Sequence, residues 1–158
     1  MKPIVPHLWF TTGADEAARF YVSIFPNSRV DRVTPAPSDT PSGPAGSVVI
    51  VDFTLNGHPF QALTAGPLDP FNHAVSFVVP CETQEEIDRY WHALLEGGQA
   101  EECGWLRDKY GLAWQIVPVV LDELIASSDT AAAKRAMDAM LKMVKLNIEA
   151  LERAYRGE

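Results

Sequence analysis

Four polar side chains recur in pairs along this chain: the histidines His7 and His73, and the glutamines Gln61 and Gln115. Imidazole and amide groups donate and accept hydrogen bonds without a permanent charge, so such a set suits the wall of a small-molecule pocket. It suits a metal less well, because hard divalent ions favour carboxylate and imidazole donors and the two amides bring no negative charge. We therefore predict a ligand-binding quartet with no resident metal and no cofactor.

The quartet is proposed because parts of the chain repeat. The stretch Asp15-Glu-Ala-Ala-Arg-Phe-Tyr returns seventy residues later as Glu85-Glu-Ile-Asp-Arg-Tyr-Trp. The stretch Gly57-His-Pro-Phe-Gln-Ala-Leu returns as Gly111-Leu-Ala-Trp-Gln-Ile-Val. Two matches in the same order indicate a duplicated module. The repeat places Gln61 on Gln115 and, with four extra residues before the second helix, His7 on His73.

The elements that carry these residues can be predicted from apolar spacing and turn residues. An Asn56-Gly57 pair is typical of a tight hairpin turn. Strands are predicted at Ile4 to Phe10, Arg29 to Val33, Val48 to Leu55, Pro59 to Leu63, His73 to Val79 and Leu112 to Val117. Helices are predicted at Ala14 to Phe25, at Thr83 to Glu96 and from Leu121 almost to the end, with Asn147 as a cap that divides the last stretch.

Two segments stand apart from this series. The stretch from Thr34 to Ser47 holds four prolines, two glycines and three serines, so we predict a long, exposed and mobile loop. Near the end, apolar residues recur at steps of three and four, which predicts one helical stripe packed on its own domain or on a second subunit. The stripe is formed by Met137, Leu141, Val144, Ile148, Leu151 and Tyr155.

Aromatic and thiol groups add to the candidate site. Trp9 and Trp105 are predicted to line the pocket with the quartet, although tryptophans in strands are more often core residues. Trp114 should face away from its neighbour Gln115, because side chains alternate along a strand. Cys103 beside a glycine could be a nucleophile, but nothing in the sequence supplies a base or a positive field to form its thiolate.

Composition limits the partners and the compartment. The net charge of -8 and the sequence pI of about 4.9 are unfavourable for binding nucleic acid or an anionic membrane. The 158 residues hold two cysteines, no CxxC pair, no signal-peptide pattern and no long apolar run. We predict a cytoplasmic protein that binds neither nucleic acid nor membrane.

These segments together resemble the vicinal oxygen chelate superfamily, which includes glyoxalase, bleomycin-resistance proteins and extradiol dioxygenases, and within it the PhnB-like branch. The likeness covers nearly the whole chain. It is carried by LWFTTGADEAARFYVSIFPNSRV from Leu8, FTLNGHPFQALTAGP from Phe53, FNHAVSFVVPCETQEEIDRYW from Phe71 and CGWLRDKYGLAWQIVP from Cys103.

The resemblance implies an α+β fold of two tandem βαβββ modules, a glyoxalase-like paired sheet, with a C-terminal helical tail. The corresponding domains are residues 1–120, made of modules at about 1–66 and 67–120, and a helical extension at 121–158. It also implies a homodimer, and in catalytic relatives a divalent metal held by four strands. Gln115 falls in the slot of the last glutamate of that metal site, and His73 in the slot of a histidine.

Two function classes remain open at this stage. The neutral quartet favours a protein that binds a small metabolite in the cavity of a homodimer. The superfamily favours a metal-dependent lyase, isomerase or dioxygenase. The branch is often labelled as a methyltransferase, but the sequence lacks the glycine-rich strand-to-helix turn that usually cradles a nucleotide-like cofactor.

Overall fold

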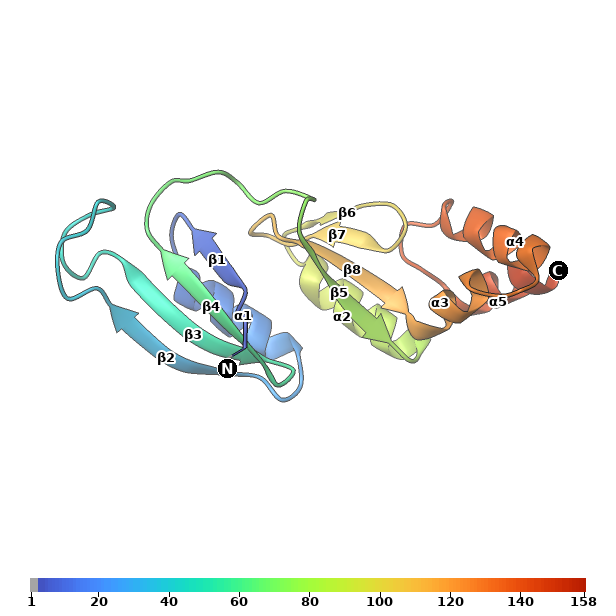
Figure 1. Cartoon of the computed structure of the whole chain (residues 1–158), viewed down its shortest axis with the longest axis horizontal. Helices are drawn as coiled ribbons and strands as arrows, with labels where there is room; N and C mark the ends of the chain where they lie inside the picture. The colour runs from blue at the N-terminus through green and yellow to red at the C-terminus, as the bar shows by residue number, and fades with distance from the viewer. Residues whose placement is uncertain (1–2) are drawn as a thin grey trace. The chain divides into compact units, whose positions relative to one another are not determined.

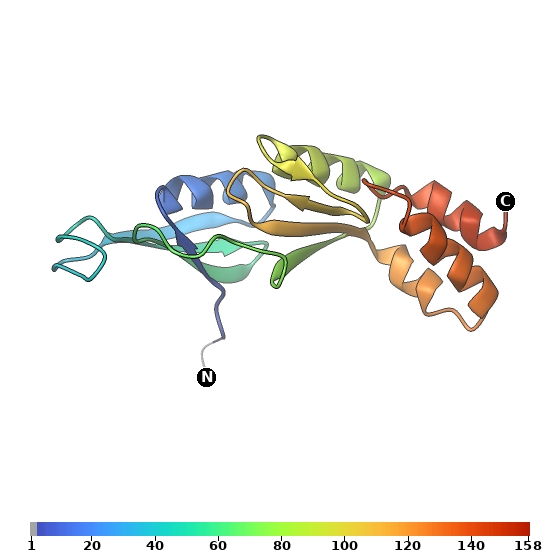
Figure 2. The same cartoon turned by 90° about the horizontal axis from the view of Figure 1, so that it is seen from above.

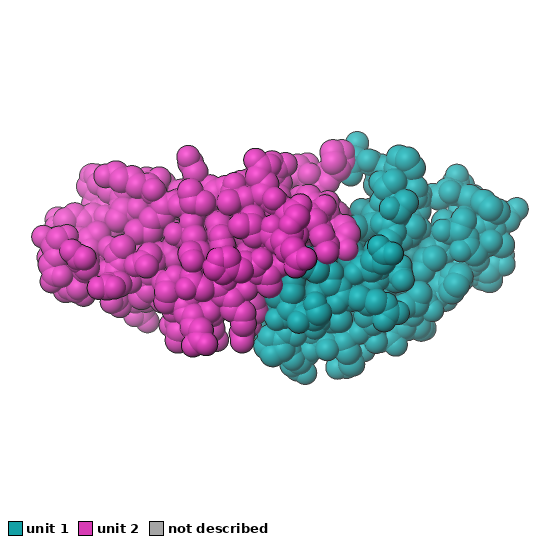
Figure 3. All heavy atoms as spheres, turned by 180° about the vertical axis from the view of Figure 1, so that it is seen from behind, with its two compact units in different colours: residues 1–69 teal, residues 70–158 magenta. Residues whose placement is uncertain are grey.

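The computed structural model describes residues 3–158, which form two compact units (Figure 3). Unit 1 comprises residues 1–69 and unit 2 residues 70–158. Each contains one sheet of four strands and one helix that packs on it, in the order strand, helix, three strands (Figure 1). The predicted pair of βαβββ modules and the α+β class are therefore confirmed.

Unit 1 has the strand order β1-β4-β3-β2, with β1 parallel to β4 and the other pairs antiparallel. Its elements are β1 (His7–Phe10), α1 (Ala14–Ile24), β2 (Arg29–Pro35), β3 (Val49–Leu55) and β4 (His58–Thr64). The β3–β4 turn uses Asn56 and Gly57, both with positive φ, as a tight hairpin turn requires. The predicted hairpin is thus confirmed.

The helix α1 covers one face of the unit 1 sheet (Figure 2). Its buried side chains, among them Ala17 and Tyr21, share a core with Val51, Phe53 and Ala62 of the strands. Alternation then places the neighbouring residues of each strand on the opposite face. We call that second surface the open face of unit 1.

Unit 2 repeats this plan with the strand order β5-β8-β7-β6. Its elements are β5 (Ser76–Cys81), α2 (Gln84–Leu95), β6 (Gln99–Ala100), β7 (Trp105–Arg107) and β8 (Ala113–Pro118). Thr83 accepts a hydrogen bond from the backbone of Glu86 and so caps α2. Ile87, Trp91 and Leu94 of α2 are buried with Leu106 and Ile116, which leaves an open face here too.

The C-terminal part of unit 2 consists of three helices, where the sequence predicts a helical stretch divided only at Asn147. They are α3 (Val119–Ile125), α4 (Thr130–Met140) and α5 (Ile148–Arg156), and Asn147 caps α5 as its sequence position suggests. Leu121, Leu146 and Leu151 form their core. Residues 141–147 are not helical, so the continuous stripe is a wrong prediction: Leu141 and Val144 are about half exposed.

The same segment is bound to the rest of unit 2 by backbone hydrogen bonds, and this explains why it leaves the helix. Cys103 donates its N–H to the carbonyl of Met143, and Gly104 donates to that of Val144. Gln84 of α2 accepts from the N–H of Ile148 and donates to the carbonyl of Leu146. These bonds replace the helical ones and place Leu146 in the core.

The loop between β2 and β3 is exposed, as predicted, but it has local structure of its own. The N–H of Gly46 donates to the carbonyl of Ala36, and the N–H of Ala36 donates to the carbonyl of Val48. The carboxylate of Asp39 accepts from the N–H of Ala45, and Thr40 pairs with Gly43. The segment therefore closes on itself through short-range bonds rather than running as a featureless loop.

Candidate functional site

The open face of unit 1 carries a row of four polar side chains, one from each strand. The strand register places His7 opposite Gln61, Gln61 opposite Asp52, and Asp52 opposite Arg32. His7 Nδ1 lies 2.8 Å from Gln61 Oε1, and Gln61 Nε2 lies 2.8 Å from Asp52 Oδ1. The guanidinium of Arg32 binds Asp52 Oδ2 through Nε at 2.9 Å and Nη2 at 2.7 Å. We call these four residues the unit 1 row.

Charge in the unit 1 row is concentrated on one ion pair. The hydrogen bond from Gln61 is the main cause that lowers the pKa of Asp52, Arg32 lowers it further, and burial opposes them. Asp52 is therefore ionised at neutral pH and compensated by Arg32. Trp9, two residues after His7, lies on the same face, and its indole N–H donates to the carbonyl of Gly66.

The open face of unit 2 holds the other predicted residues in a different arrangement. Trp105 lies opposite Gln115 in the strand register, and Gln115 donates to the hydroxyl of Ser76 at 2.8 Å. His73 Nε2 lies 2.7 Å from Glu101 Oε2, with its ring 5.9 Å from that of Trp105 between centroids. His73 and Gln115 are thus both close to Trp105, the first by ring packing and the second by register.

His73 corrects the predicted repeat. His73 lies three residues before β5 rather than inside a strand. In the strand register Val78 lies opposite Gln115, just as His7 lies opposite Gln61 in unit 1. The structural counterpart of His7 is therefore Val78, whose side chain is 55% exposed. The four extra residues noted in the sequence lengthen the segment before β5, which shifts the second histidine out of register.

Two carboxylates of the site were missed by the sequence reasoning. Asp52 binds Gln61, and Glu101 binds both His73 and Arg107, the latter through Nε at 2.7 Å. Burial raises the pKa of Glu101, but the hydrogen bonds from His73 and Arg107 outweigh it and lower the pKa. The quartet is thus not purely neutral, although an arginine balances each carboxylate. The signal for Asp52 was its place opposite Gln61 in the predicted hairpin.

The Asp108–Gln115 segment contributes structure rather than an exposed acid. Asp108 is 3% exposed, and its carboxylate accepts from the N–H groups of Tyr110 and Leu112 and from the indole of Trp114. Gly111 has a φ of 85° and donates to the carbonyl of Asp108. This turn starts β8 and puts Trp114 on the α2 side, as predicted, and Gln115 on the open face.

A divalent metal, which the superfamily resemblance implies, does not fit the donors within either unit. Among residues 3–158, no group of three or more His, Cys, Asp or Glu side chains could hold an ion. Gln61 uses its oxygen for His7 and its nitrogen for Asp52, and His73 Nε2 is bound to Glu101. Because these atoms are already bound to protein partners, neither unit offers an ion the set of donors that it requires.

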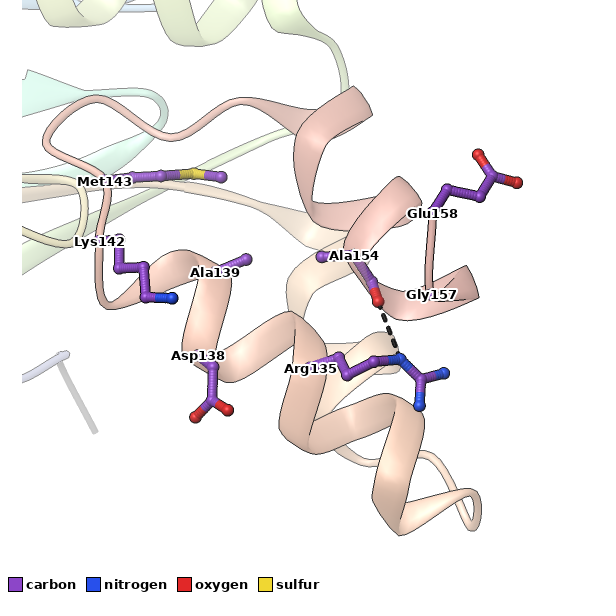
Figure 4. Close-up of a pocket in the computed structure, with 8 residues that line it drawn as sticks. All are labelled: Arg135, Asp138, Ala139, Lys142, Met143, Ala154, Gly157 and Glu158. Carbon is purple, nitrogen blue, oxygen red and sulfur yellow. Dashed lines mark hydrogen bonds between the residues drawn. The ribbon is translucent and has the colours of Figure 1, made fainter.

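A pocket of about 560 Å³ lies in the C-terminal helices and is an alternative location for a ligand (Figure 4). Its lining has charges of both signs, from Arg135 and Lys142 and from Asp138 and Glu158. Arg135 donates to the carbonyls of Ala154 and Tyr155 and so stabilises the end of α5. The guanidinium that the pocket offers is therefore already used by the fold.

The two cysteines do not form a competing site. Cys81 is buried, and this burial, together with Glu86, raises the pKa of its thiol to about 11. Cys103 is partly exposed and has a positive φ. In residues 3–158 every buried polar side-chain atom has a hydrogen-bond partner, and no helix there is long and apolar enough to cross a membrane.

Comparison with known proteins gives a consistent result. The family model described as 3-demethylubiquinone-9 3-methyltransferase matches residues 2–117. The PhnB protein of Bacillus cereus is 33% identical, with a TM-score of 0.65, over 75% of this chain and 100% of that one. No match was found among curated proteins.

Two more distant structures share the fold. Protein PA1353 from Pseudomonas aeruginosa is 19% identical, with a TM-score of 0.62, over 75% of this chain and 98% of that one. The fosfomycin resistance protein FosX of Listeria monocytogenes is 15% identical, with a TM-score of 0.56, over 77% of this chain and 94% of that one. The family match ends before α3, so the C-terminal pocket lies outside it.

Proposed function

Because the chain belongs to the 3-demethylubiquinone-9 3-methyltransferase family of PhnB-like proteins, in the vicinal oxygen chelate superfamily, we propose that it binds a small metabolite as a homodimer. The open sheet faces supply the binding surface. The protein acts without a resident metal, and its place is the cytoplasm, where its two free cysteines stay reduced.

One observation carries this proposal: the unit 1 row lies on the sheet face opposite α1, beside Trp9. The imidazole of His7, the amide of Gln61 and the Asp52–Arg32 ion pair are joined there by successive hydrogen bonds, and His7 is exposed. A polar line next to an indole is the usual composition of a small-molecule site, in which apolar surface supplies affinity and a few polar groups fix orientation. Trp105 and Gln115 provide the same pairing of groups in unit 2.

The methyl-transfer chemistry in the family's description is not part of the proposal. A nucleotide-like methyl donor is usually held by a glycine-rich turn between a strand and a helix. Here the turn between β1 and α1 has one glycine, Gly13, and the turn between β5 and α2 has none. Binding to the open faces does not require such a turn.

Nuclear magnetic resonance of the indole N–H groups tests the binding surface. A panel of small organic acids, phosphates and aromatic metabolites is titrated into the labelled protein, and the signals of Trp9 and Trp105 are followed. Trp114 is the internal control, because its indole is buried under α2 and bound to Asp108. We expect a bound compound to shift Trp9 or Trp105 and leave Trp114 in place. Compounds that shift only residues around Arg135 would refute the proposal.

Elemental analysis separates this function from the metal-dependent lyase, isomerase or dioxygenase class. Protein purified without added metal should contain no stoichiometric zinc, manganese or nickel. One divalent ion per chain that survives dialysis would favour the enzyme class instead. Light scattering at micromolar concentration tests the homodimer, and a mass of about 17.4 kDa would remove it.

A further inference from the structure

The unit 1 row has a defined direction of hydrogen bonding. An ionised carboxylate can only accept, so the atom of Gln61 that faces Asp52 must be the amide nitrogen. Asp52 cannot turn to present another group, because its second oxygen is held by two bonds from Arg32. The amide oxygen of Gln61 must therefore face His7.

This direction fixes the proton on His7. Gln61 Oε1 can only accept, so His7 Nδ1, at 2.8 Å, must carry the hydrogen. In the neutral ring the other nitrogen, Nε2, then has a free lone pair. An exposed neutral histidine otherwise prefers the opposite tautomer, with the hydrogen on Nε2.

We propose that Asp52 is a positioning residue which, through Gln61, holds neutral His7 as the Nδ1–H tautomer. The Nε2 lone pair then faces outward beside Trp9 as an acceptor for a ligand hydroxyl or N–H group. The role for a ligand rests on the proposed function, whereas the tautomer is a property of the free protein. The ligands selected are those with a donor, such as alcohols, hydroxy acids and amines.

Unit 2 shows that the fold itself does not require this row. In the equivalent register Val78 stands for His7 and Trp105 for Asp52, and Gln115 alone is retained from the row. Glu101, next to Trp105 across β6 and β7, stands where unit 1 has Arg32. The equivalent strands of unit 2 thus form a sheet without this chain of bonds, so the sheet architecture does not depend on it.

The variant Asp52→Asn tests the inference with almost no change in shape. Arg32 still requires an oxygen, so the new amide nitrogen turns toward Gln61. Gln61 then reverses, its nitrogen faces His7, and His7 must accept at Nδ1. We expect the ratio of Nδ1–H to Nε2–H rings of His7 to fall at least tenfold, because the hydrogen bond between His7 and Gln61 then runs in the opposite direction.

The readout is the pair of ring ¹⁵N shifts of His7, measured without ligand at about pH 8.5, well above the ordinary histidine pKa of about 6.5. His58, which is exposed, gives the reference for an unrestrained ring. Asp31→Asn is the matched control, because Asp31 pairs with Arg29 and Thr54 and does not contact Gln61. The control should retain the Nδ1–H ring. Gln61→Met, which removes the link, should give the reference ratio.

Two results would overturn the inference. One is a wild-type His7 that is mainly Nε2–H, and the other is an Asp52→Asn protein whose His7 keeps the wild-type ratio. The expected tautomers together with a ligand panel that shifts neither Trp9 nor Trp105 would count against the proposed function and leave the positioning role of Asp52 standing.

Discussion

Replacing Asp108 by asparagine should destabilise the protein through one specific bond. The carboxylate oxygen Oδ1 accepts from the backbone of Tyr110 and Leu112 at 2.8 and 3.1 Å, and Oδ2 accepts from Trp114 Nε1 at 2.9 Å. An asparagine can keep its oxygen at the first position and so retain both backbone bonds. Its amide nitrogen then faces the indole N–H, and two donors oppose each other without an acceptor.

The magnitude follows from the burial of this pair. Asp108 and Trp114 are each 3% exposed, so water cannot replace the lost acceptor. An unsatisfied buried donor costs about 1 to 3 kcal/mol, and we expect about 2 kcal/mol for Asp108→Asn. Asp108→Ala removes all three acceptor contacts and should cost about 4 kcal/mol or more, a large part of the roughly 5 to 15 kcal/mol that stabilise a small domain.

A double-mutant cycle in urea isolates the bond. Trp114→Phe removes the indole N–H, so Asp108→Asn should cost little in that background, with a coupling energy of about 1 to 2 kcal/mol. The slope of unfolding against urea should stay unchanged. A full loss of about 2 kcal/mol in both backgrounds would refute the reasoning, because the cost would then come from the lost charge and not from the opposed donors. The result also bears on the position of Gln115, because the turn that Asp108 stabilises leads into β8, the strand that contains Gln115.

Three further outcomes are expected. The pKa of Asp52 and of Glu101 is lowered in the folded state, so both carboxylates stabilise the protein above the ordinary carboxylate pKa of about 4. They lose that contribution as the pH falls through their lowered pKa values. In urea unfolding between about pH 6 and pH 3, the Asp52→Asn variant should therefore lose less stability than the wild type, and an equal loss would contradict this. Cys81 is buried and its thiol pKa is raised to about 11, so a thiol reagent should modify only Cys103 in the native chain and both cysteines in urea. Modification of the native chain should therefore be lost in the Cys103→Ser variant. If it persists there, the modified residue is Cys81. Removing residues 38–45 should leave the melting temperature nearly unchanged, because the hydrogen bonds of that loop are short-range; a large decrease in calorimetry would show that the loop packs elsewhere.

Local sequence was sufficient for the elements whose formation depends on near neighbours. The Asn56-Gly57 hairpin, the Thr83 and Asn147 caps and the two module helices each follow from a few adjacent residues. The repeat of Gln61 as Gln115 could also be found, because the two strands share their starting glycine and its positive φ. The alternation of Trp114 and Gln115 needed only the geometry of a strand.

Partners that are distant along the chain could not be read in this way. Glu101 looks like an ordinary acidic residue in the sequence, and only the folded chain brings it to His73, which precedes β5. Because of the length of the segment before β5, His73 lies outside the strand, and Val78 occupies the position in unit 2 that is equivalent to His7. Spacing in a sequence cannot show such a shift, because strand register is set by the packed face of the sheet.

The C-terminal segment shows the same division most clearly. Helical spacing continues in the sequence through residues 141–147, and spacing is a local property, so the sequence predicts helix up to the cap at Asn147. In the structure Cys103 and Gly104 donate their N–H groups to the carbonyls of Met143 and Val144, and Gln84 binds the carbonyl of Leu146 and the N–H of Ile148, on either side of Asn147. Hydrogen bonds formed between segments about forty to sixty residues apart outcompete the local helical ones, and only the tertiary structure brings those segments together.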